Sequence, residues 1–322
     1  MSRPIIVVLD GATLNPGDNP WTKLEAIGQV VVYDRSPPST IAMRARDASV
    51  VVVNKVKLSR EFFEQAPTVR FVAVTATGTD CVDSVAARER GVPVANVPIY
   101  GTDSVAQFVF ALLLNACHHV DLHNQAVHDG EWGRAADFCF WKTPLLELAG
   151  RTIGIVGFGR IGRRVGDLAH AFGMSVLAHN PHRGPVPSYE PFAWVELEEL
   201  FVRSDVISLH CPATPQTRGI VNRQLLGHVR PHAVLINTSR GDLIVEADLA
   251  TALDRGQLAA AAVDVASAEP IRPDNPLLKA KNCVITPHIA WATLAARQRL
   301  MAATVQNVAN FLAGNPTNVV NP

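Results

Sequence analysis

The sequence predicts a two-domain α/β protein in which each domain is a parallel β-sheet covered by helices. Three observations predict this class. Short runs rich in valine and isoleucine alternate with helix-like segments along most of the chain. A strand, a glycine-rich turn and an amphipathic helix follow one another within residues 151–180. The length of 322 residues is comfortable for two domains and long for one.

The first hundred residues predict one small α/β domain. The expected strands are residues 4–9, 29–33, 49–53, 70–75 and 92–95. The expected helices are residues 21–27, 39–46, 59–65 and 82–90. A parallel sheet follows from this alternation, because a crossover between parallel strands usually passes through a helix.

A strongly apolar, proline-free segment, residues 103–129, predicts one long and largely buried helix. We expect the chain to pass between the domains here. Part of this helix exceeds what one subunit is expected to cover, which predicts a homodimer. The next loop contains Phe138, Phe140 and Trp141. These aromatic side chains either pack beneath the loop or line a substrate cleft or a subunit contact.

The second α/β series begins with the strand Thr152–Val156 and the pattern G-x-G-x-x-G at Gly157, Gly159 and Gly162. The first glycine permits a tight turn, the second lets the backbone approach a pyrophosphate, and the third lets the helix pack close to the strand. Free N–H groups at the helix start then face the phosphate. The pattern predicts dinucleotide binding, and a glycine turn in another kind of α/β protein is the alternative.

The remaining elements continue the second domain. The expected strands are residues 205–209, 233–237, 260–265 and 283–286, and the expected helices are residues 196–202, 222–227 and 246–255. A last helix, residues 291–312, has no strand after it and is expected to return to the first domain. The predicted boundaries are therefore 1–99 for the first part of the substrate domain, 100–289 for the cofactor domain, and 290–322 for the returning helix.

Three polar stretches follow predicted strands of the second domain. They place Arg240, Glu269 and His288 where strands end. In an open α/β sheet, ligands bind outside the carboxyl ends of the strands. A guanidinium that binds anions, a carboxylate and a titratable imidazole are therefore expected at one edge. Taken singly, each residue has a structural alternative. Arg240 would cap a strand end, Glu269 would lie in a solvated turn, and His288 would be a hydrogen-bonded loop histidine.

At this point the chain resembles the D-isomer-specific 2-hydroxyacid dehydrogenases. The stretches GFGRIG, CPATPQT, NTSRGDLI, DVASAEP and TPHIAW are similar to that family's motifs and stand in the family's order. VPIYGTDSVAQFVFALLL, DFCFW and TPHIAWAT, which are less specific, most resemble glycerate dehydrogenases, also called hydroxypyruvate reductases. The resemblance implies two doubly wound domains, a Rossmann cofactor domain and a flavodoxin-like substrate domain.

The resemblance also implies a reaction, the transfer of hydride between NAD(P) and a short 2-oxo or 2-hydroxy acid. Hydroxypyruvate and D-glycerate are the expected pair, with glyoxylate as a second substrate. His288 would supply the proton, Glu269 would hold its ring, and Arg240 would bind the substrate carboxylate and polarise the carbonyl. The alternatives are a dehydrogenase for a bulkier 2-oxo acid and a non-catalytic NAD(H)-sensing protein. Selectivity is expected to depend on loops near residues 54–57 and 138–141.

Two sets of binding residues follow from the resemblance. The cofactor set is Gly157, Gly159, Arg160, Ile161, Gly162, Asn180, Arg183, Cys211, Pro212, Thr217, Thr238, Ser239, Arg240, Asp264 and His288. The substrate set is Thr77, Gly78, Arg240 and His288, in which Thr77 and Gly78 offer backbone N–H groups. Thr238 and Asp264 are expected near the nicotinamide.

One position departs from the usual dinucleotide pattern. The strand after the glycine helix commonly ends in an acid that binds the adenosine ribose, and here it ends at Asn180. Asparagine carries no charge to repel a 2′-phosphate, and Arg183 can pair with one. The cofactor is therefore NAD(H) or NADP(H), with NADP(H) slightly favoured. The alternative is that Asn180 binds the ribose and Arg183 is solvated.

Composition excludes several classes of function. The formal net charge is zero, so no partner such as nucleic acid or a membrane surface is expected through bulk charge. The apolar run Ile5–Leu9 is too short for a signal peptide. Five scattered cysteines without C-x-x-C spacing predict a reduced, cytoplasmic protein. His119 and His123 have metal-ligand spacing but no clear third ligand, so no metal site is expected.

Overall fold

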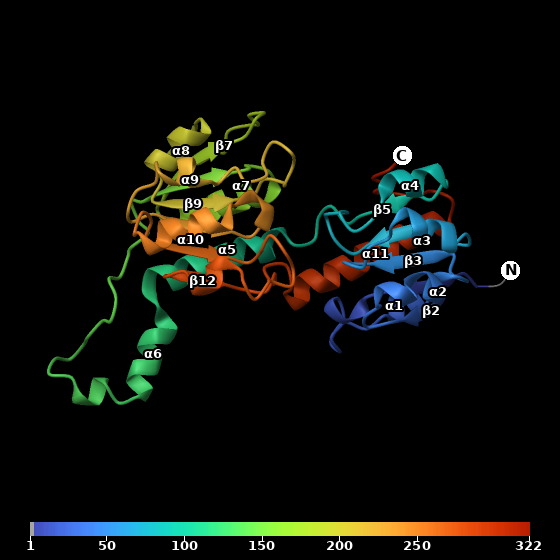
Figure 1. Ribbon diagram of the computed structural model, residues 1–322, viewed down its shortest axis with the longest axis horizontal. Helices are drawn as coiled ribbons and strands as arrows, with labels where there is room; N and C mark the ends of the chain where they lie inside the picture. Colours follow the sequence, from blue (N-terminus) through green and yellow to red (C-terminus); the bar gives the residue numbers. More distant parts are fainter. Residues whose placement is uncertain (1–2) are drawn as a thin grey trace. The chain divides into compact units, whose positions relative to one another are not determined.

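The structure, a computed structural model, describes residues 3–322 and forms two compact units. The N-terminal unit extends to Gly101 and includes Trp291–Pro322, and the central unit is Thr102–Ala290 (Figure 1). The chain therefore passes from one unit to the other twice, at Gly101–Thr102 and at Ala290–Trp291.

The N-terminal unit contains a five-stranded sheet. Its strands are β1 (Ile5–Val8), β2 (Gln29–Val32), β3 (Val50–Val53), β4 (Phe71–Val74) and β5 (Val94–Ala95). Their order is β2-β1-β3-β4-β5, and every neighbouring pair is parallel. This is the flavodoxin-like order, in which the direction of winding changes between β1 and β3. The predicted flavodoxin-like class is confirmed.

Helices cover both faces of this sheet. They are α1 (Thr22–Glu25), α2 (Ile41–Ala45), α3 (Arg60–Gln65), α4 (Ser84–Glu89) and α11 (Leu294–Leu312). The last helix packs on the face that includes Phe71, whose ring stacks on that of Phe311 with centroids 4.5 Å apart. On the other face, Phe62 and Phe63 of α3 are buried among strand valines. The C-terminal helix thus completes the core of the first unit.

The central unit contains a seven-stranded sheet. Its strands are β6 (Thr152–Val156), β7 (Ser175–His179), β8 (Phe192–Trp194), β9 (Val206–Leu209), β10 (Val234–Asn237), β11 (Ala260–Val263) and β12 (Cys283–Ile285). The order is β12-β11-β10-β9-β6-β7-β8, and all pairs are parallel. The winding changes direction between β6 and β9, as in a Rossmann fold. The predicted Rossmann class is confirmed, with β8 as an additional edge strand.

Two helical layers enclose the central sheet. The helices of these layers are α5 (Thr102–His118), α7 (Arg160–Ala171), α8 (Leu197–Arg203), α9 (Arg223–Leu226) and α10 (Glu246–Asp254), whereas α6 (Val120–His128) lies outside them. On one face, α5 and α7 bury Val109, Leu113 and Val165 against strand residues. On the other face, α8, α9 and α10 contribute Leu200, Leu225 and Leu249, respectively, to a second core.

The prediction of one helix over residues 103–129 is wrong. His119 has a left-handed backbone, with φ 44°, and it separates α5 from α6, which are bent by 54°. α5 is a core helix, whereas Ala126 is the one buried residue of α6. Among the described residues, no single helix is long and apolar enough to cross a membrane, although this bent pair passes by length and composition.

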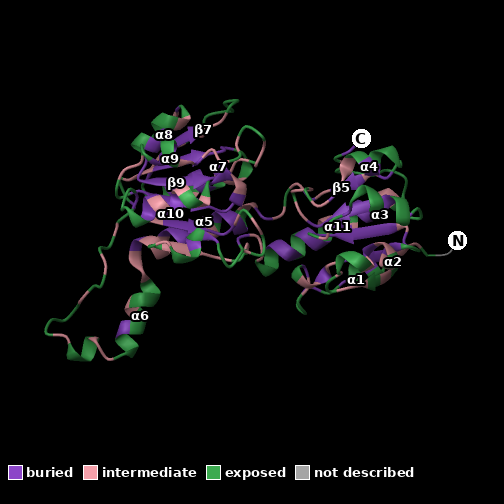
Figure 2. Ribbon diagram, viewed as in Figure 1, coloured by how far each residue is buried: buried purple, intermediate pink, exposed green. Residues whose placement is uncertain are grey.

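Residues 119–145, which we call the arm, extend away from the central sheet (Figures 1 and 2). Most of the arm is exposed, including 89% of Phe138 and 66% of Trp141. The interpretation that these two aromatic side chains pack beneath their own loop is therefore wrong. Phe140 is half-buried. The arm leaves a set of large apolar side chains uncovered within one copy of the chain.

Candidate functional site

The glycine turn after β6 is built by close backbone approaches. Gly157 has φ 97°, and a Cβ atom there would lie 2.4 Å from the backbone nitrogen of Cys211. A Cβ at Gly162 would lie 2.2 Å from the carbonyl oxygen of Gly157. Both glycines are required, because no side chain fits between β6, α7 and the loop after β9.

The start of α7 faces open space. Gly159 is the residue before this helix, and a Cβ there would meet no described atom within 4 Å. Arg160 and Ile161 form the first turn, where backbone N–H groups point toward the N-terminal end of the helix. An exposed helix start with a glycine before it is suited to a pyrophosphate.

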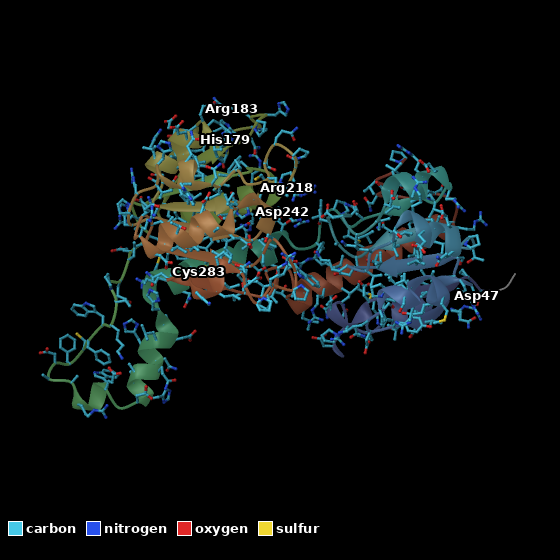
Figure 3. All side chains as sticks on the ribbon, in the orientation of Figure 1. Asp47, His179, Arg183, Arg218, Asp242 and Cys283 are labelled. Atoms are coloured by element: carbon cyan, nitrogen blue, oxygen red, sulfur yellow. The ribbon has the colours of Figure 1, made fainter. Side chains whose placement is uncertain are left out.

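Asn180 and Arg183 follow β7 and are both engaged. The side-chain Oδ1 of Asn180 accepts a hydrogen bond from the backbone nitrogen of Phe158 at 2.9 Å. Its remaining polar group is therefore an amide donor, where an aspartate would offer an acceptor. Arg183 lies at the surface and forms an ion pair with Glu196 at 2.7 Å (Figure 3).

The loops after β9 and β10 are hydrogen-bonded to each other. Ser239 donates from Oγ to the carbonyl oxygen of Cys211 at 2.7 Å, and Thr217 donates from Oγ1 to that of Pro212 at 2.6 Å. Arg218 and Asp242, one from each loop, form an ion pair at 3.0 Å (Figure 3). Burial raises the pKa of the Cys211 thiol to about 11, so it stays protonated at neutral pH.

Thr238 gives a direct indication that a cofactor fits. It follows β10, is 8% exposed, and its Oγ1 atom has no hydrogen-bond partner among residues 3–322. A buried hydroxyl without a partner is costly unless a ligand supplies one. Its place at the carboxyl end of a central strand is where a nicotinamide cofactor would supply polar groups. The residues present therefore fit the group.

Asp264 anchors the loop that follows β12. It is fully buried; Oδ1 accepts from Oγ1 of Thr286 at 2.6 Å and from the backbone nitrogen of Ile289 at 2.9 Å. Its Oδ2 accepts from the backbone nitrogen of Ala290 at 2.8 Å. These bonds bracket His288. The predicted approach of Asp264 to the nicotinamide stays a prediction, whereas its contacts within the protein hold the histidine loop.

Replacing Asp264 by asparagine should destabilise this loop. The amide nitrogen would face a backbone or hydroxyl donor, so at least one buried hydrogen bond is lost. We expect the free energy of unfolding to fall by about 2 kcal/mol, measured by urea denaturation. Asp274→Asn, an exposed change in the same stretch of chain, should stay within about 0.5 kcal/mol of the parent. Equal effects of the two changes would contradict the anchoring role.

His288 and Glu269 form a pair. The Nδ1 atom of His288 lies 2.7 Å from Oε2 of Glu269, and both side chains are partly exposed. The backbone nitrogen of Ala266 lies 3.4 Å from Oε1 of the same carboxylate. Because Glu269 engages Nδ1, the ring orientation is fixed and Nε2 is the nitrogen turned away from the carboxylate. His288 itself has a left-handed backbone, with φ 54°.

The loop of Arg240 packs directly on the loop of Glu269. A Cβ at Gly241 would lie 1.9 Å from the carbonyl carbon of Ala266, so the two backbones touch. The side chain of Asn237 donates to the carbonyl oxygen of Arg240 at 2.8 Å, and Nη1 of Arg240 donates to that of Ser239 at 2.8 Å. The structure therefore brings the loops after β10, β11 and β12 together within the central unit.

Thr77 and Gly78 follow β4 in the N-terminal unit. Oγ1 of Thr77 donates to the carbonyl oxygen of Val97 at 3.0 Å. The side-chain amide of Asn96 donates to the carbonyl oxygen of Thr77 at 2.7 Å. This stretch is thus held by the loop after β5. The part of the two residues as backbone donors to a substrate carboxylate stays a prediction.

His210 was not singled out from the sequence. It follows β9, its Nε2 atom lies 2.8 Å from Oγ of Ser208, and burial lowers its pKa to about 3. The ring is therefore neutral at neutral pH. The sequence feature that could have identified it is a histidine directly after the apolar strand Val206–Leu209. Residues 3–322 contain no group of three or more metal-binding side chains, and His123 contacts the His119 carbonyl instead.

Comparisons with known proteins show what the chain as a whole is similar to. Residues 110–290 match the model of the D-isomer specific 2-hydroxyacid dehydrogenase, NAD binding domain. A hydroxypyruvate reductase from Blautia hydrogenotrophica is 52% identical over 319 residues, 98% of this chain and 99% of that protein. A glycerate dehydrogenase from Methylorubrum extorquens is 37% identical over 88% of each chain. A solved structure is also similar: that of an NADPH-dependent glyoxylate/hydroxypyruvate reductase from Sinorhizobium meliloti in complex with NADP and malonate. Its sequence is 31% identical, and the TM-score is 0.82, with 97% of this chain and 94% of that chain covered.

Proposed function

The chain belongs to the D-isomer-specific 2-hydroxyacid dehydrogenase family, and from that membership we propose that it reduces hydroxypyruvate to D-glycerate with NAD(P)H. Members of this family are oxidoreductases that use a nicotinamide cofactor, and the chain is therefore one as well. The observation that carries the narrower proposal is the 52% identity with a hydroxypyruvate reductase over nearly the full length of both chains. Glyoxylate is the proposed second substrate.

The proposed chemistry assigns one task to each of three side chains. When bound, the nicotinamide supplies the hydride. His288 gives a proton to the carbonyl oxygen, and Glu269, 2.7 Å from Nδ1, stabilises the charged ring and keeps it oriented. Arg240 binds the substrate carboxylate with its planar fork and polarises the carbonyl. In this assignment Nε2 of His288 is the proton donor.

The cofactor is proposed to lie along the carboxyl edge of the central sheet. Gly159, Arg160 and Ile161 would meet the pyrophosphate at the start of α7. Thr238 would give its buried hydroxyl a partner at the nicotinamide end. Pro212 and Thr217 would line the adenosine side.

A steady-state panel tests the substrate. NADH and NADPH are each assayed against hydroxypyruvate, glyoxylate, pyruvate and phenylpyruvate, and kcat/KM is compared. Hydroxypyruvate should give the highest value and glyoxylate the next. A preference for phenylpyruvate would identify a dehydrogenase for bulkier oxo acids. Tight cofactor binding without turnover of any of the four would favour a non-catalytic sensor of NAD(H).

We propose NADP(H) as the preferred cofactor, with Arg183 as the residue that binds the 2′-phosphate. Its ion pair with Glu196 is exposed and therefore weak, so a phosphate can replace the carboxylate. Arg183→Ala should lower the NADPH-to-NADH ratio of kcat/KM by about 10-fold. Glu196→Gln should raise that ratio, because it frees the guanidinium.

The control for the cofactor test is Arg203→Ala, which removes another exposed arginine, one that is ion-paired with Glu199. It should leave the ratio unchanged. If neither Arg183→Ala nor Glu196→Gln moves the ratio, Arg183 is solvated and Asn180 serves the ribose alone.

We propose that the protein is a homodimer whose contact includes the arm. The support is the exposure of Phe138, Trp141 and Trp132, which leaves several aromatic side chains in water. One chain has a mass of 34.7 kDa, and light scattering should give twice that mass. Phe138→Glu should shift the mass toward the monomer, whereas Met43→Glu, an exposed change in the N-terminal unit, should not. A monomer mass for the parent protein removes the proposal.

We also propose a cytoplasmic location. All five cysteines are free, which suits a reducing compartment. A zero formal net charge gives no general attraction to nucleic acid or to an anionic membrane. The proposed partners are therefore the small acid, the cofactor and a second copy of the chain.

A further inference from the structure

The N-terminal sheet contains a polar site that the proposed mechanism does not use. Its winding changes direction between β1 and β3. In sheets of this order, ligands bind outside the carboxyl ends of the strands at that point. Asp10 follows β1 there, and residues 54–56 follow β3. A carboxylate thus lies at the place where the topology favours a ligand.

The carboxylate of Asp10 is bound to three consecutive backbone N–H groups. Its Oδ1 atom accepts from Asn54 at 2.7 Å. Its Oδ2 atom accepts from Lys55 at 2.6 Å and from Val56 at 2.9 Å. Hydrogen bonds to an ionised acceptor are the strong ones, so this side chain fixes the path of the loop after β3.

Asn54 extends the same network to the loop after β4. Its buried side-chain amide donates to the carbonyl oxygen of Thr75 at 2.6 Å and to the hydroxyl oxygen of the same threonine at 3.1 Å. The thiol of Cys81 donates to the carbonyl oxygen of Asn54 at 3.4 Å. Both ends of the segment 75–81 are therefore attached to Asn54, and that segment contains Thr77 and Gly78.

We propose that Asp10 is a positioning residue for substrate binding. It fixes residues 54–56, and Asn54 transfers this order to the segment 75–81. The backbone N–H groups of Thr77 and Gly78 are thereby held in the orientation that binds a carboxylate. The proposal rests on the proposed function, since it assumes that a 2-oxo acid is the ligand of this segment.

A purely electrostatic role for Asp10 would have the opposite sign. Lys55 and Lys57 are exposed on the same loop. Removing the negative charge of Asp10 makes the loop more positive, which by itself attracts an anionic substrate and lowers KM. Loss of positioning weakens binding and raises KM. The direction of the change therefore separates the two roles.

Asp10→Asn is the informative variant, because it keeps the shape and replaces one acceptor oxygen by an amide donor. We expect KM for hydroxypyruvate to rise about 10-fold and kcat to stay within about 2-fold. KM for NADPH should not change. The matched control is Asp248→Asn, which alters a carboxylate bound to the backbone nitrogen of Arg223 at 2.9 Å in the central unit. An unchanged or lower KM for hydroxypyruvate in Asp10→Asn overturns the proposal.

Hydrogen exchange measured by mass spectrometry gives a readout that does not need turnover. In Asp10→Asn, peptides that cover residues 54–56 and 75–81 should both exchange faster than in the parent. Faster exchange confined to residues 54–56 overturns the transfer through Asn54. If the parent reduces no 2-oxo acid, the proposed function fails, and the exchange pattern alone decides whether Asp10 orders both segments.

Discussion

Replacement of His288 by glutamine is expected to lower the rate of hydroxypyruvate reduction by about 100-fold or more, the usual scale for loss of a general acid. Glutamine can keep a hydrogen bond to Glu269, but it has no group that releases a proton near neutral pH. The measurement is kcat for the parent and the variant at saturating NADPH and hydroxypyruvate.

Binding of the cofactor separates lost chemistry from lost structure. Quenching of protein fluorescence by NADPH should show that His288→Gln still binds the cofactor. A variant that turns over at nearly the parental rate would refute His288 as the proton donor. A variant that no longer binds NADPH would show a damaged fold instead, and the milder Glu269→Gln would then be used to perturb the same pair.

Arg240→Lys should have the second large effect. Lysine keeps the charge but loses the planar pair of donors that matches a carboxylate and its neighbouring carbonyl. Loss of a positioned donor of this type costs about 100-fold to 1,000-fold, which we expect in kcat/KM. Most of the effect should persist at saturating substrate, since the polarised carbonyl matters in the transition state.

The matched control for this change is Arg223→Lys. Arg223 is an exposed arginine of the same unit and is ion-paired with Asp248 at 3.5 Å. Its replacement should leave kcat/KM within about 2-fold of the parent. If Arg240→Lys behaves in the same way, charge alone is sufficient and the bidentate role is wrong.

Features that depend on neighbouring residues in the chain were predictable. The glycine turn is one example, because its spacing, its strand and its helix all lie within residues 151–180. The edge at which the loops of Arg240, Glu269 and His288 lie is another, because parallel strands fix where their carboxyl ends lie. Local pattern and sheet topology were enough to bring these three loops together.

Features that depend on distant contacts or on one backbone angle were not predictable. The break at His119 needs a left-handed conformation in a stretch with no glycine or proline to signal it. The strand β8, Phe192–Trp194, is too short to show a period of its own. Asp10 reaches Asn54 across 44 residues, and Asp264 reaches Ile289 across 25. No local pattern indicates which backbone N–H groups a carboxylate will accept from.

The left-handed backbone of His288 has a consequence for stability. For a residue with a Cβ atom this conformation costs roughly 1–2 kcal/mol, and glycine would adopt it freely. Random substitution therefore has a more stable choice available at this site. Glycine at this position should therefore give a more stable but inactive protein, which is the pattern expected where activity and stability are traded against each other.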